Sequence, residues 1–158
     1  MYQKLSNRAS VSQIEKEFDL RFLYPEIYTP IPIIDGSRES ILPIITNSED
    51  AFIQFGIWGI LPEHYDGSRK SFQKIEKTLH ISDTTLFQNE SIFFPSLEKN
   101  RCLIIVSGFF TYTITDGLTQ PYYVHLPNHQ PFSLAGIYNT LNDGFITCSF
   151  LLTPVKSA

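Results

Sequence analysis

GIWGILPE (residues 56–63) and NRCLIIVSGFFTY (residues 100–112) are the two stretches that decide the fold, with KTLHISDTTLF (residues 77–87) between them. Apolar residues run through both outer stretches with hardly a charge among them, which is typical of buried strands. Each stretch also brings a glycine together with aromatic side chains. We therefore expect two core strands that leave a glycine and an aromatic residue beside a surface pocket.

Length and composition indicate one packed domain. The chain has 158 residues, of which 42% are apolar, 14% aromatic and 18% charged. A chain of this length buries about two thirds of its unfolded surface, and so many aromatic residues exclude a disordered chain. The apolar runs are too short to cross a membrane, and the N-terminus has no apolar core of a secretory signal. We expect a cytoplasmic protein without membrane association.

The two cysteines, Cys102 and Cys148, both fall in apolar strand-like runs. This position favours buried, reduced thiols and leaves a disulfide as the alternative. The four histidines do not show the spacing of metal ligands, and Pro127 separates His125 from His129, so no helical pair of ligands forms. Phosphate-binding loops and nucleophile elbows are lacking. We expect no metal and no cofactor.

The net charge of −4 argues against a strong nucleic-acid binder, but the positive charge is local. Residues 69–101 hold six basic residues against four acidic ones (Arg69, Lys70, Lys74, Lys77, Lys99 and Arg101 against Glu76, Asp83, Glu90 and Glu98). A patch of this kind fits either a phosphate-binding surface or a solvated helix face.

Local patterns predict a few short helices and many strands. Two serines, each followed three residues later by Gln or Glu, precede an apolar face and predict a helix over about residues 11–19 (caps Ser10 and Ser12; face Val11, Ile14 and Phe18). A second helix is expected over about residues 69–79, and three prolines exclude a regular helix from residues 24–32. The expected strands are 42–46, 51–58, 102–106, 109–115, 121–126, 132–138 and 145–153.

Turn residues connect these strands. The tetrad 47–50 joins the first two strands into an antiparallel pair, and Asp116-Gly117 closes a hairpin. The fold class is therefore α+β, a β-rich single domain around an antiparallel, partly closed sheet with a few short helices.

Three landmarks in this order resemble the SRAP family (SOS response-associated peptidase). The first family segment, R/N-W-G-L-I-P-x-W, is similar to IWGILPEH, which keeps Trp58, Gly59 and Pro62 and has Ile57 and His64 where the family has other residues. The second, L-N-A-R-x-E-T, is similar to LHISDTT, with His80 for the asparagine, Ser82 for the arginine and Thr84 for the acid.

The third family segment, R-C-L-V-P-x-x-G-F-Y-E-W, resembles RCLIIVSGFFTY, in which Thr111 replaces the glutamate and Tyr112 the tryptophan. Later segments resemble the family as well (Gln120 to Tyr123, Pro131 to Tyr138 and Phe145 to Thr153). The shared order over about residues 42–153 implies the SRAP-like fold. It also implies a function at abasic sites in single-stranded DNA.

The resemblance implies a reaction that this chain lacks the groups to complete. Family members join an N-terminal cysteine to the aldehyde of an abasic deoxyribose: the amine forms an imine and the thiol then closes a thiazolidine. This sequence has Tyr2 in place of the cysteine. The family histidine in an H-x-R-M-P context is expected beyond the last strand, and the sequence ends at Ala158. We expect that stable cross-linking is lost and assign no catalytic residue.

Weak binding of single-stranded DNA without a bond is the first functional hypothesis. Trp58 and Phe109 are candidates to stack on bases, and four polar residues are candidates to contact phosphates or sugars (Arg69, Lys70, Arg101 and His80). The alternatives for two of these residues are a core aromatic for Trp58 and a strand-edge histidine for His80. A non-enzymatic interaction module, covered by a partner protein or by a second copy, is the second hypothesis. An active abasic-site enzyme that uses another amine is the third.

Overall fold

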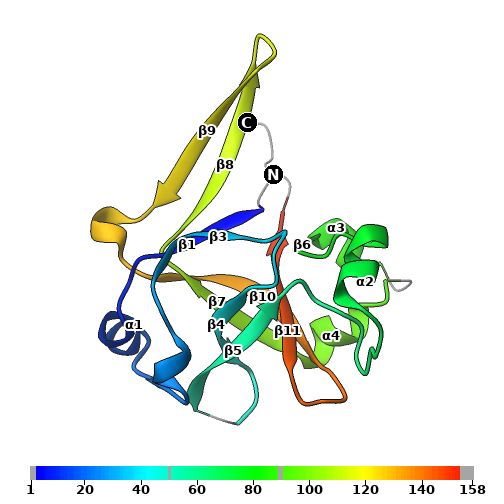
Figure 1. Ribbon diagram of the computed structural model, residues 1–158. Helices are drawn as coiled ribbons and strands as arrows, with labels where there is room; N and C mark the ends of the chain where they lie inside the picture. Colours follow the sequence, from blue (N-terminus) through cyan, green and yellow to red (C-terminus); the bar gives the residue numbers. More distant parts are fainter. Residues whose placement is uncertain (1–2, 50, 89–90, 154–158) are drawn as a thin grey trace.

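Strands dominate the described part of the chain, which comprises residues 3–49, 51–88 and 91–153 of a computed structural model (Figure 1). The strands are β1 (Lys4–Asn7), β2 (Arg21–Phe22), β3 (Ile31–Asp35), β4 (Ile41–Thr46), β5 (Phe52–Trp58), β6 (His80–Ser82), β7 (Arg101–Val106), β8 (Gly108–Thr115), β9 (Leu118–His125), β10 (Phe132–Thr140) and β11 (Ile146–Leu152). The helices are α1 (Val11–Phe18), α2 (Arg69–Ile75), α3 (Asp83–Leu86) and α4 (Phe94–Lys99), with the 3-10 turns η1 (Pro25–Ile27) and η2 (Pro127–His129).

The larger of the two described sheets closes on itself. Its strand order is β2-β5-β4-β7-β10-β11-β6, and β11 also pairs with β5, with Thr147 opposite Ile57 and Cys148 opposite Trp58. Strands β5, β4, β7, β10 and β11 therefore form a ring. This confirms the partly closed, β-rich α+β fold, although β5 pairs with β11, β11 with β6 and β2 with β5 in parallel.

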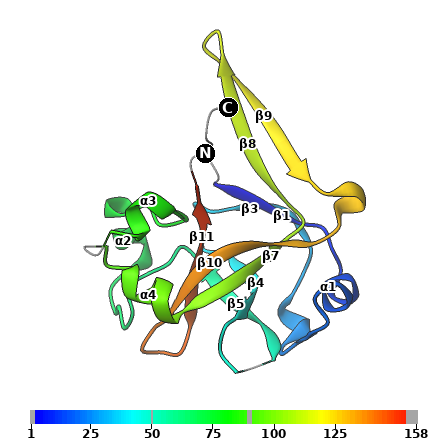
Figure 2. The ribbon, with the colours of Figure 1, turned by 180° about the vertical axis from the view of Figure 1, so that it is seen from behind.

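The smaller sheet has the order β3-β1-β8-β9 and carries a long hairpin. Strand β7 passes into β8 through Ser107 alone, and the backbone N–H of Ser107 donates to the carbonyl of Ser6 in β1 at 2.8 Å. The two sheets are thus continuous through one chain segment. Figures 1 and 2 show that the far half of the hairpin β8–β9 projects away from the rest of the molecule.

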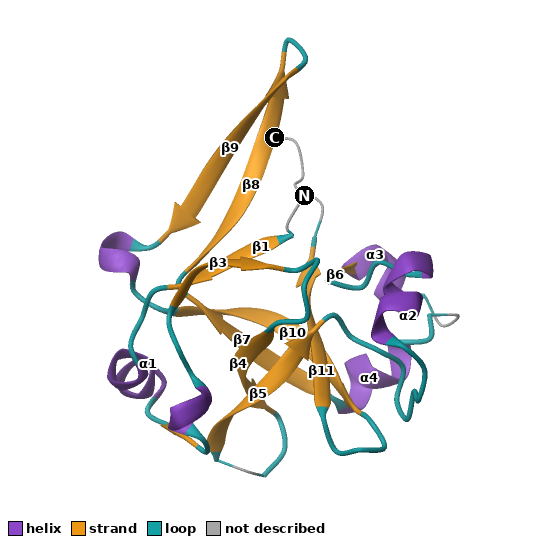
Figure 3. Cartoon of the chain, in the orientation of Figure 1, coloured by secondary structure: helices purple, strands orange, loops and turns teal. Residues whose placement is uncertain are grey.

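Apolar side chains fill the ring and both of its flanks. The largest cluster contains Leu42, Ile44, Trp58, Ile104 and Cys148. A second cluster packs α1 against the sheet, and a third places α3 and α4 beside β6 and β10 (Figure 3). The second is built on Ala9, Ile14, Phe22, Ile53 and Ile105, and the third on Ile60, Ile81, Leu86, Phe93 and Ile137.

Several local predictions are confirmed. Ser10 and Gln13 form a reciprocal capping box at the start of α1. Strands β4 and β5 pair antiparallel, and the hairpin turns at Asp116 and Gly117, both with positive φ, as a two-residue turn of this type requires. Cys102 and Cys148 are buried and free.

One prediction about local structure is wrong. Helix α2 ends at Ile75 instead of Leu79, because Glu76 is extended and the chain turns into β6. As predicted, residues 24–32 hold no regular α-helix: η1 is a 3-10 turn, and Pro32 lies in β3, which forms the edge of its sheet. Proline is tolerated there because an edge strand has one side without ladder partners.

Candidate functional site

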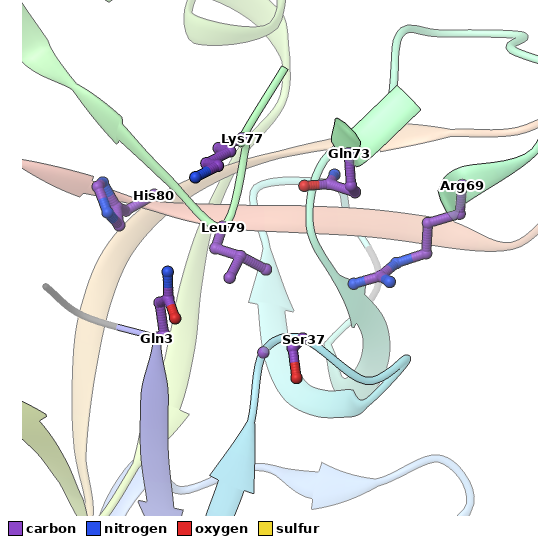
Figure 4. Close-up of a pocket in the computed structure, with 8 residues that line it drawn as sticks. Gln3, Ser37, Arg69, Gln73, Lys77, Leu79 and His80 are labelled. Carbon is purple, nitrogen blue, oxygen red and sulfur yellow. The ribbon is translucent and has the colours of Figure 1, made fainter. Parts of the chain in front are cut away.

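A cavity of about 350 Å³ opens beside the start of β1 (Figure 4). Three separate parts of the chain meet there: the residue before β1, the turn after β3, and the segment from α2 to β6. The lining residues are Gln3, Gly36, Ser37, Arg69, Gln73, Lys77, Leu79 and His80. Because they include a guanidinium, an amine, an imidazole and two amides but no carboxylate, the cavity is suited to an anionic or strongly polar ligand.

Arg69 is held at one wall of the cavity by the core. Its Nη2 donates to the backbone carbonyl of Trp58 at 2.7 Å, while its Nε is buried without a hydrogen-bond partner. Burial lowers the pKa of Arg69, and the nearby charge of Glu39 opposes this shift. The guanidinium nevertheless stays charged, because arginine is not deprotonated in proteins.

Gly59 allows Arg69 and Gln73 to approach the backbone this closely. Its φ is +111°, and a Cβ at this position would lie 3.1 Å from Arg69 Nη2 and 3.1 Å from Gln73 Nε2. Glycine adopts this φ without the steric penalty that other residues meet. The family-like Trp58-Gly59 pair thus positions the cationic wall from inside the core.

The wall between α2 and β6 is fixed by buried hydrogen bonds. Gln73 Nε2 donates to Thr78 Oγ1 at 2.5 Å, and Thr78 Oγ1 donates to the carbonyl of Ile60 at 2.7 Å. Ser149 Oγ donates to the carbonyl of Thr78 and accepts from the N–H of Ile60 at 2.8 Å. These contacts join α2, the segment before β6, and β11. They fix the backbone at Thr78, which lies between Lys77 and His80 in the chain.

His80 begins β6, opposite Phe150 of β11, and their ring centroids lie 6.0 Å apart. Burial lowers the pKa of His80 below its ordinary value of 6.5, so the imidazole is neutral at pH 7. Lys77 and His80 also line a second cavity, which has a volume of about 510 Å³. These two residues therefore lie at the boundary between the two cavities.

Two of the six nucleic-acid-binding candidates line the cavity, Arg69 and His80. Lys70 follows Arg69 in α2 and is exposed, but it is not part of the lining. Arg101 is exposed at the start of β7, and its backbone N–H donates to Asn47 Oδ1 at 3.2 Å. It does not line the cavity either. The local positive charge of the sequence is therefore divided over different surfaces.

The two aromatic candidates do not reach this cavity. Trp58 is 0% exposed and its Nε1 donates to the carbonyl of Leu79 at 2.8 Å, so the prediction that it stacks on a base is wrong. The alternative, a core aromatic, is confirmed. Phe109 is half-buried, packs edge-on against Phe132 at 6.5 Å, and lines a separate apolar recess with Leu134, Phe150 and Leu152.

Sequence reasoning did not select Gln3, Ser37, Gln73 or Lys77, although all four line the cavity. Of these four, only Lys77 could have been selected from the sequence, because it lies two residues before the LHISDTT segment. Thr111, at the family's glutamate position, lies on β8 opposite Tyr122, and Ser82 ends β6 with its Oγ 2.8 Å from Thr84 Oγ1. Tyr2 lies outside the described residues.

The two thiols are unsuited to nucleophilic chemistry. Burial raises the pKa of Cys102 to about 12 and raises that of Cys148 well above its ordinary value. Since the thiolate is the reactive form, both groups are inert in the folded protein. Over residues 3–49, 51–88 and 91–153, the structure brings no three His, Cys, Asp or Glu side chains together as metal ligands. Within the same ranges, every helix is too short or too polar to cross a membrane.

The closed sheet, together with a cationic cavity beside β1 of the smaller sheet, defines a β-rich α+β domain with one candidate ligand site. The family model described as SOS response associated peptidase (SRAP) matches residues 3–157. The chain belongs to the SRAP family.

A curated relative agrees with this membership, and solved structures share the fold. Over 76 residues the chain is 28% identical to the abasic site processing protein HMCES of Gallus gallus, a match that covers 46% of this chain and 21% of that protein. A crystal structure of a protein from Bacteroides thetaiotaomicron superposes with a TM-score of 0.79 at 23% identity, over 98% of this chain and 69% of the other. One from Bordetella bronchiseptica has a TM-score of 0.71 at 13% identity, over 96% and 71%.

Proposed function

We propose that this SRAP-family chain binds single-stranded DNA at abasic sites through the cavity beside β1, without forming a stable thiol-derived cross-link. The observation that carries the proposal is the lining, which places Arg69, Lys77 and His80 together, with no carboxylate among the described residues of the wall. A phosphate or an open sugar would meet cations and amide donors there. The chicken relative is an abasic site processing protein, and this likeness indicates abasic sites as the substrate class.

The absence of a stable cross-link follows from the thiols. A thiazolidine needs a thiol and an amine that react with the same aldehyde, yet the two cysteines of the sequence are buried and have raised pKa values. The family's glutamate position holds Thr111, which cannot exchange a proton at neutral pH as a carboxylate does. Binding through ion pairs and polar contacts remains, and such binding weakens as the salt concentration rises.

The test measures affinity and covalent capture on the same oligonucleotide. Fluorescence anisotropy with a labelled single strand that carries a natural abasic site should show saturable, salt-sensitive binding. Denaturing electrophoresis without a reducing agent should show no adduct. A heat-stable unreduced adduct would refute the loss of cross-linking, and no binding at low salt would refute the DNA-binding function itself.

Arg69→Gln tests whether the cavity is the binding surface. Loss of one charge-assisted hydrogen bond costs about 1.5–3 kcal/mol, so the dissociation constant should rise by about 10- to 100-fold. Lys16→Gln is the matched control, because Lys16 is exposed on α1 and away from the lining. Equal effects of the two substitutions would indicate binding to net charge and not to this cavity.

A protein-interaction role is the second candidate, favoured by the projecting hairpin. Ile114 is 67% exposed and Leu118 is 74% exposed, and Tyr112 and Tyr122 are exposed as well. Asp116 is the only charged residue between Gly108 and His125. An exposed apolar surface with so little charge is typical of an interface. Sedimentation velocity over a concentration series should reveal self-association of the parent protein. The double variant Ile114→Thr/Leu118→Thr should remain monomeric. A parent protein that is monomeric at all concentrations would argue against a dimer.

A further inference from the structure

We propose that a cavity at the C-terminal end of β1 binds a small neutral aromatic molecule with one N–H or O–H donor, of the size of indole. This cavity has a volume of about 220 Å³ and shares no lining residue with the cationic one. Asn7, the last residue of β1, lines it and gives it the name Asn7 cavity. Such a site goes beyond the proposed DNA-binding function, and either can fail without the other.

The wall of the Asn7 cavity is mostly apolar. Its hydrocarbon surface comes from the rings of Tyr28 and Phe55, from Pro43 and from four isoleucines. None of the described lining residues has a charged side chain at pH 7, so an ion would lose its hydration there without gaining a partner. The isoleucines are Ile27, Ile31, Ile34 and Ile41. A neutral and largely apolar ligand therefore fits this wall.

The side chain of Asn7 supplies a buried acceptor that has no partner. Asn7 is 1% exposed, and its Nδ2 donates to the carbonyl of Ile105 in β7 at 3.0 Å. This bond fixes which end of the amide is nitrogen, since a carbonyl can only accept. Its Oδ1 is buried and meets no hydrogen-bond donor in the described part of the chain. Because an unpaired buried acceptor is unfavourable, a ligand with a donor gains from pairing with it.

Two neighbouring groups cannot donate to Asn7. The pairing of β1 with β3 is irregular here: Asn7 lies opposite Ile31, and the next residue of β3, Pro32, has no N–H. The hydroxyl of Tyr28 donates instead to the carbonyl of Ala9 at 2.6 Å. Burial raises the pKa of Tyr28 to about 12, so this hydroxyl stays neutral at pH 7. A molecule that enters the cavity can therefore supply the missing donor.

The size and the rings of the cavity suit a flat ligand of two fused rings. A dry apolar cavity of about 150 Å³ holds benzene, so a volume of about 220 Å³ has room for indole. Phe22 packs against both Tyr28 and Phe55, with ring centroids 5.3 Å and 5.7 Å away, and so holds the two rings of the wall in place. Contacts between aromatic rings contribute energy beyond the area that they bury, which favours an aromatic ligand.

Three of the four isoleucines are exposed in the protein without ligand. Ile27 is 47% exposed, and Ile31 and Ile41 are each 46% exposed. They come from η1, β3 and β4, and a ligand that covers them removes apolar surface from water. Ile34 is only 5% exposed. The ligand's rings would therefore cover the isoleucines while its donor reaches the buried amide of Asn7.

Indole and benzothiophene test the donor, because the two molecules have nearly the same shape and only indole has an N–H. Binding is followed by NMR on protein with ¹³C-labelled isoleucine methyl groups. We expect indole to bind about 5-fold or more tightly than benzothiophene, with NOEs to the methyl groups of the four lining isoleucines. Equal affinities, NOEs only to other isoleucines, or no binding of indole up to its solubility limit would each overturn the proposal.

Ile31→Glu blocks the site, and Ile33→Glu is the matched control. Both isoleucines are exposed on β3, but only Ile31 lines the cavity. A ligand would have to desolvate the new carboxylate, so Ile31→Glu should raise the dissociation constant of indole by about 10-fold or more. Ile33→Glu should bind indole like the parent protein. Equal effects of the two substitutions would place the binding site elsewhere.

Asn7→Leu tests the acceptor itself, since leucine has a similar shape and no Oδ1. The variant should bind benzothiophene like the parent protein, which reports an intact cavity, and should no longer prefer indole. A preference for indole that persists in this variant would refute the role of Asn7. If the loss of the bond to Ile105 prevents folding, the two ligands on the parent protein and the glutamate pair on β3 still decide the question.

Discussion

Gly59→Ala tests whether the core positions the cationic wall of the cavity. Alanine would have to adopt a φ of +111°, and its Cβ would lie 3.1 Å from both Arg69 Nη2 and Gln73 Nε2. A non-glycine residue in a sparsely populated region of backbone space costs about 1–3 kcal/mol. The two contacts are tighter than ordinary van der Waals distance, so the side chains must move by a few tenths of an ångström.

Neither side chain can move without weakening a hydrogen bond. Arg69 Nη2 is 2.7 Å from the carbonyl of Trp58, and Gln73 Nε2 is 2.5 Å from Thr78 Oγ1. A typical intramolecular hydrogen bond contributes about 0.5–1.5 kcal/mol to stability, so weakening two of them adds about 1–3 kcal/mol. We expect a total loss of about 2–6 kcal/mol in the free energy of unfolding.

Gly144→Ala is the matched control. Gly144 also has a positive φ, +88°, but a Cβ there would meet no atom within 4 Å. This variant therefore carries the backbone strain alone, about 1–3 kcal/mol. Urea denaturation gives both free energies, and anisotropy with abasic DNA gives the affinities. We expect Gly59→Ala to lose more stability than Gly144→Ala and to bind DNA more weakly, while Gly144→Ala binds like the parent protein. Equal stability losses together with unchanged DNA affinity would show that Gly59 does not position Arg69 and Gln73.

Three further outcomes follow from burial. The single tryptophan, Trp58, is fully buried, so acrylamide and abasic DNA should leave its fluorescence almost unquenched; strong quenching by DNA would restore a stacking role. Because burial lowers the pKa of His80 below 6.5, the unfolded chain binds this proton more tightly, and the stability that neutral His80 allows is lost as the pH falls below 6.5. His80→Gln should flatten the decline of unfolding free energy between about pH 7 and pH 5, and parallel curves would contradict this. Cys102, whose pKa is raised to about 12, and Cys148 should react with a thiol reagent at pH 8 only after unfolding; rapid labelling of folded protein would show that they are accessible.

Short-range patterns explain which elements could be predicted. The capping box of α1 and the turn at Asp116-Gly117 are local, and both are found in the structure. Strand β1, with the sequence KLSN, carries no such signal; it becomes a strand because β3 and β8 pair with its two sides. Strand β6 likewise has three residues and exists through its pairing with β11.

The candidate site could be predicted only in part for the same reason. Arg69 was found through the local excess of basic residues, and His80 because it lies in the LHISDTT segment that resembles the family. Trp58 belongs to such a landmark as well, yet its ring is in the core and acts through its hydrogen bond to Leu79. A motif identifies a position in the fold, whereas the direction of a side chain depends on which strand lies next to it.

The amino-acid sequence alone determined the family, the order of the main strands and the chemical groups that are available, since these are properties of composition and local pattern. It also determined that the cysteines are Cys102 and Cys148. Only the tertiary structure decided that both are buried, and that Gln3, Arg69, Lys77 and His80 surround one cavity. Pairing between distant strands brings these residues together, and burial sets which of their groups can reach a ligand or accept a proton.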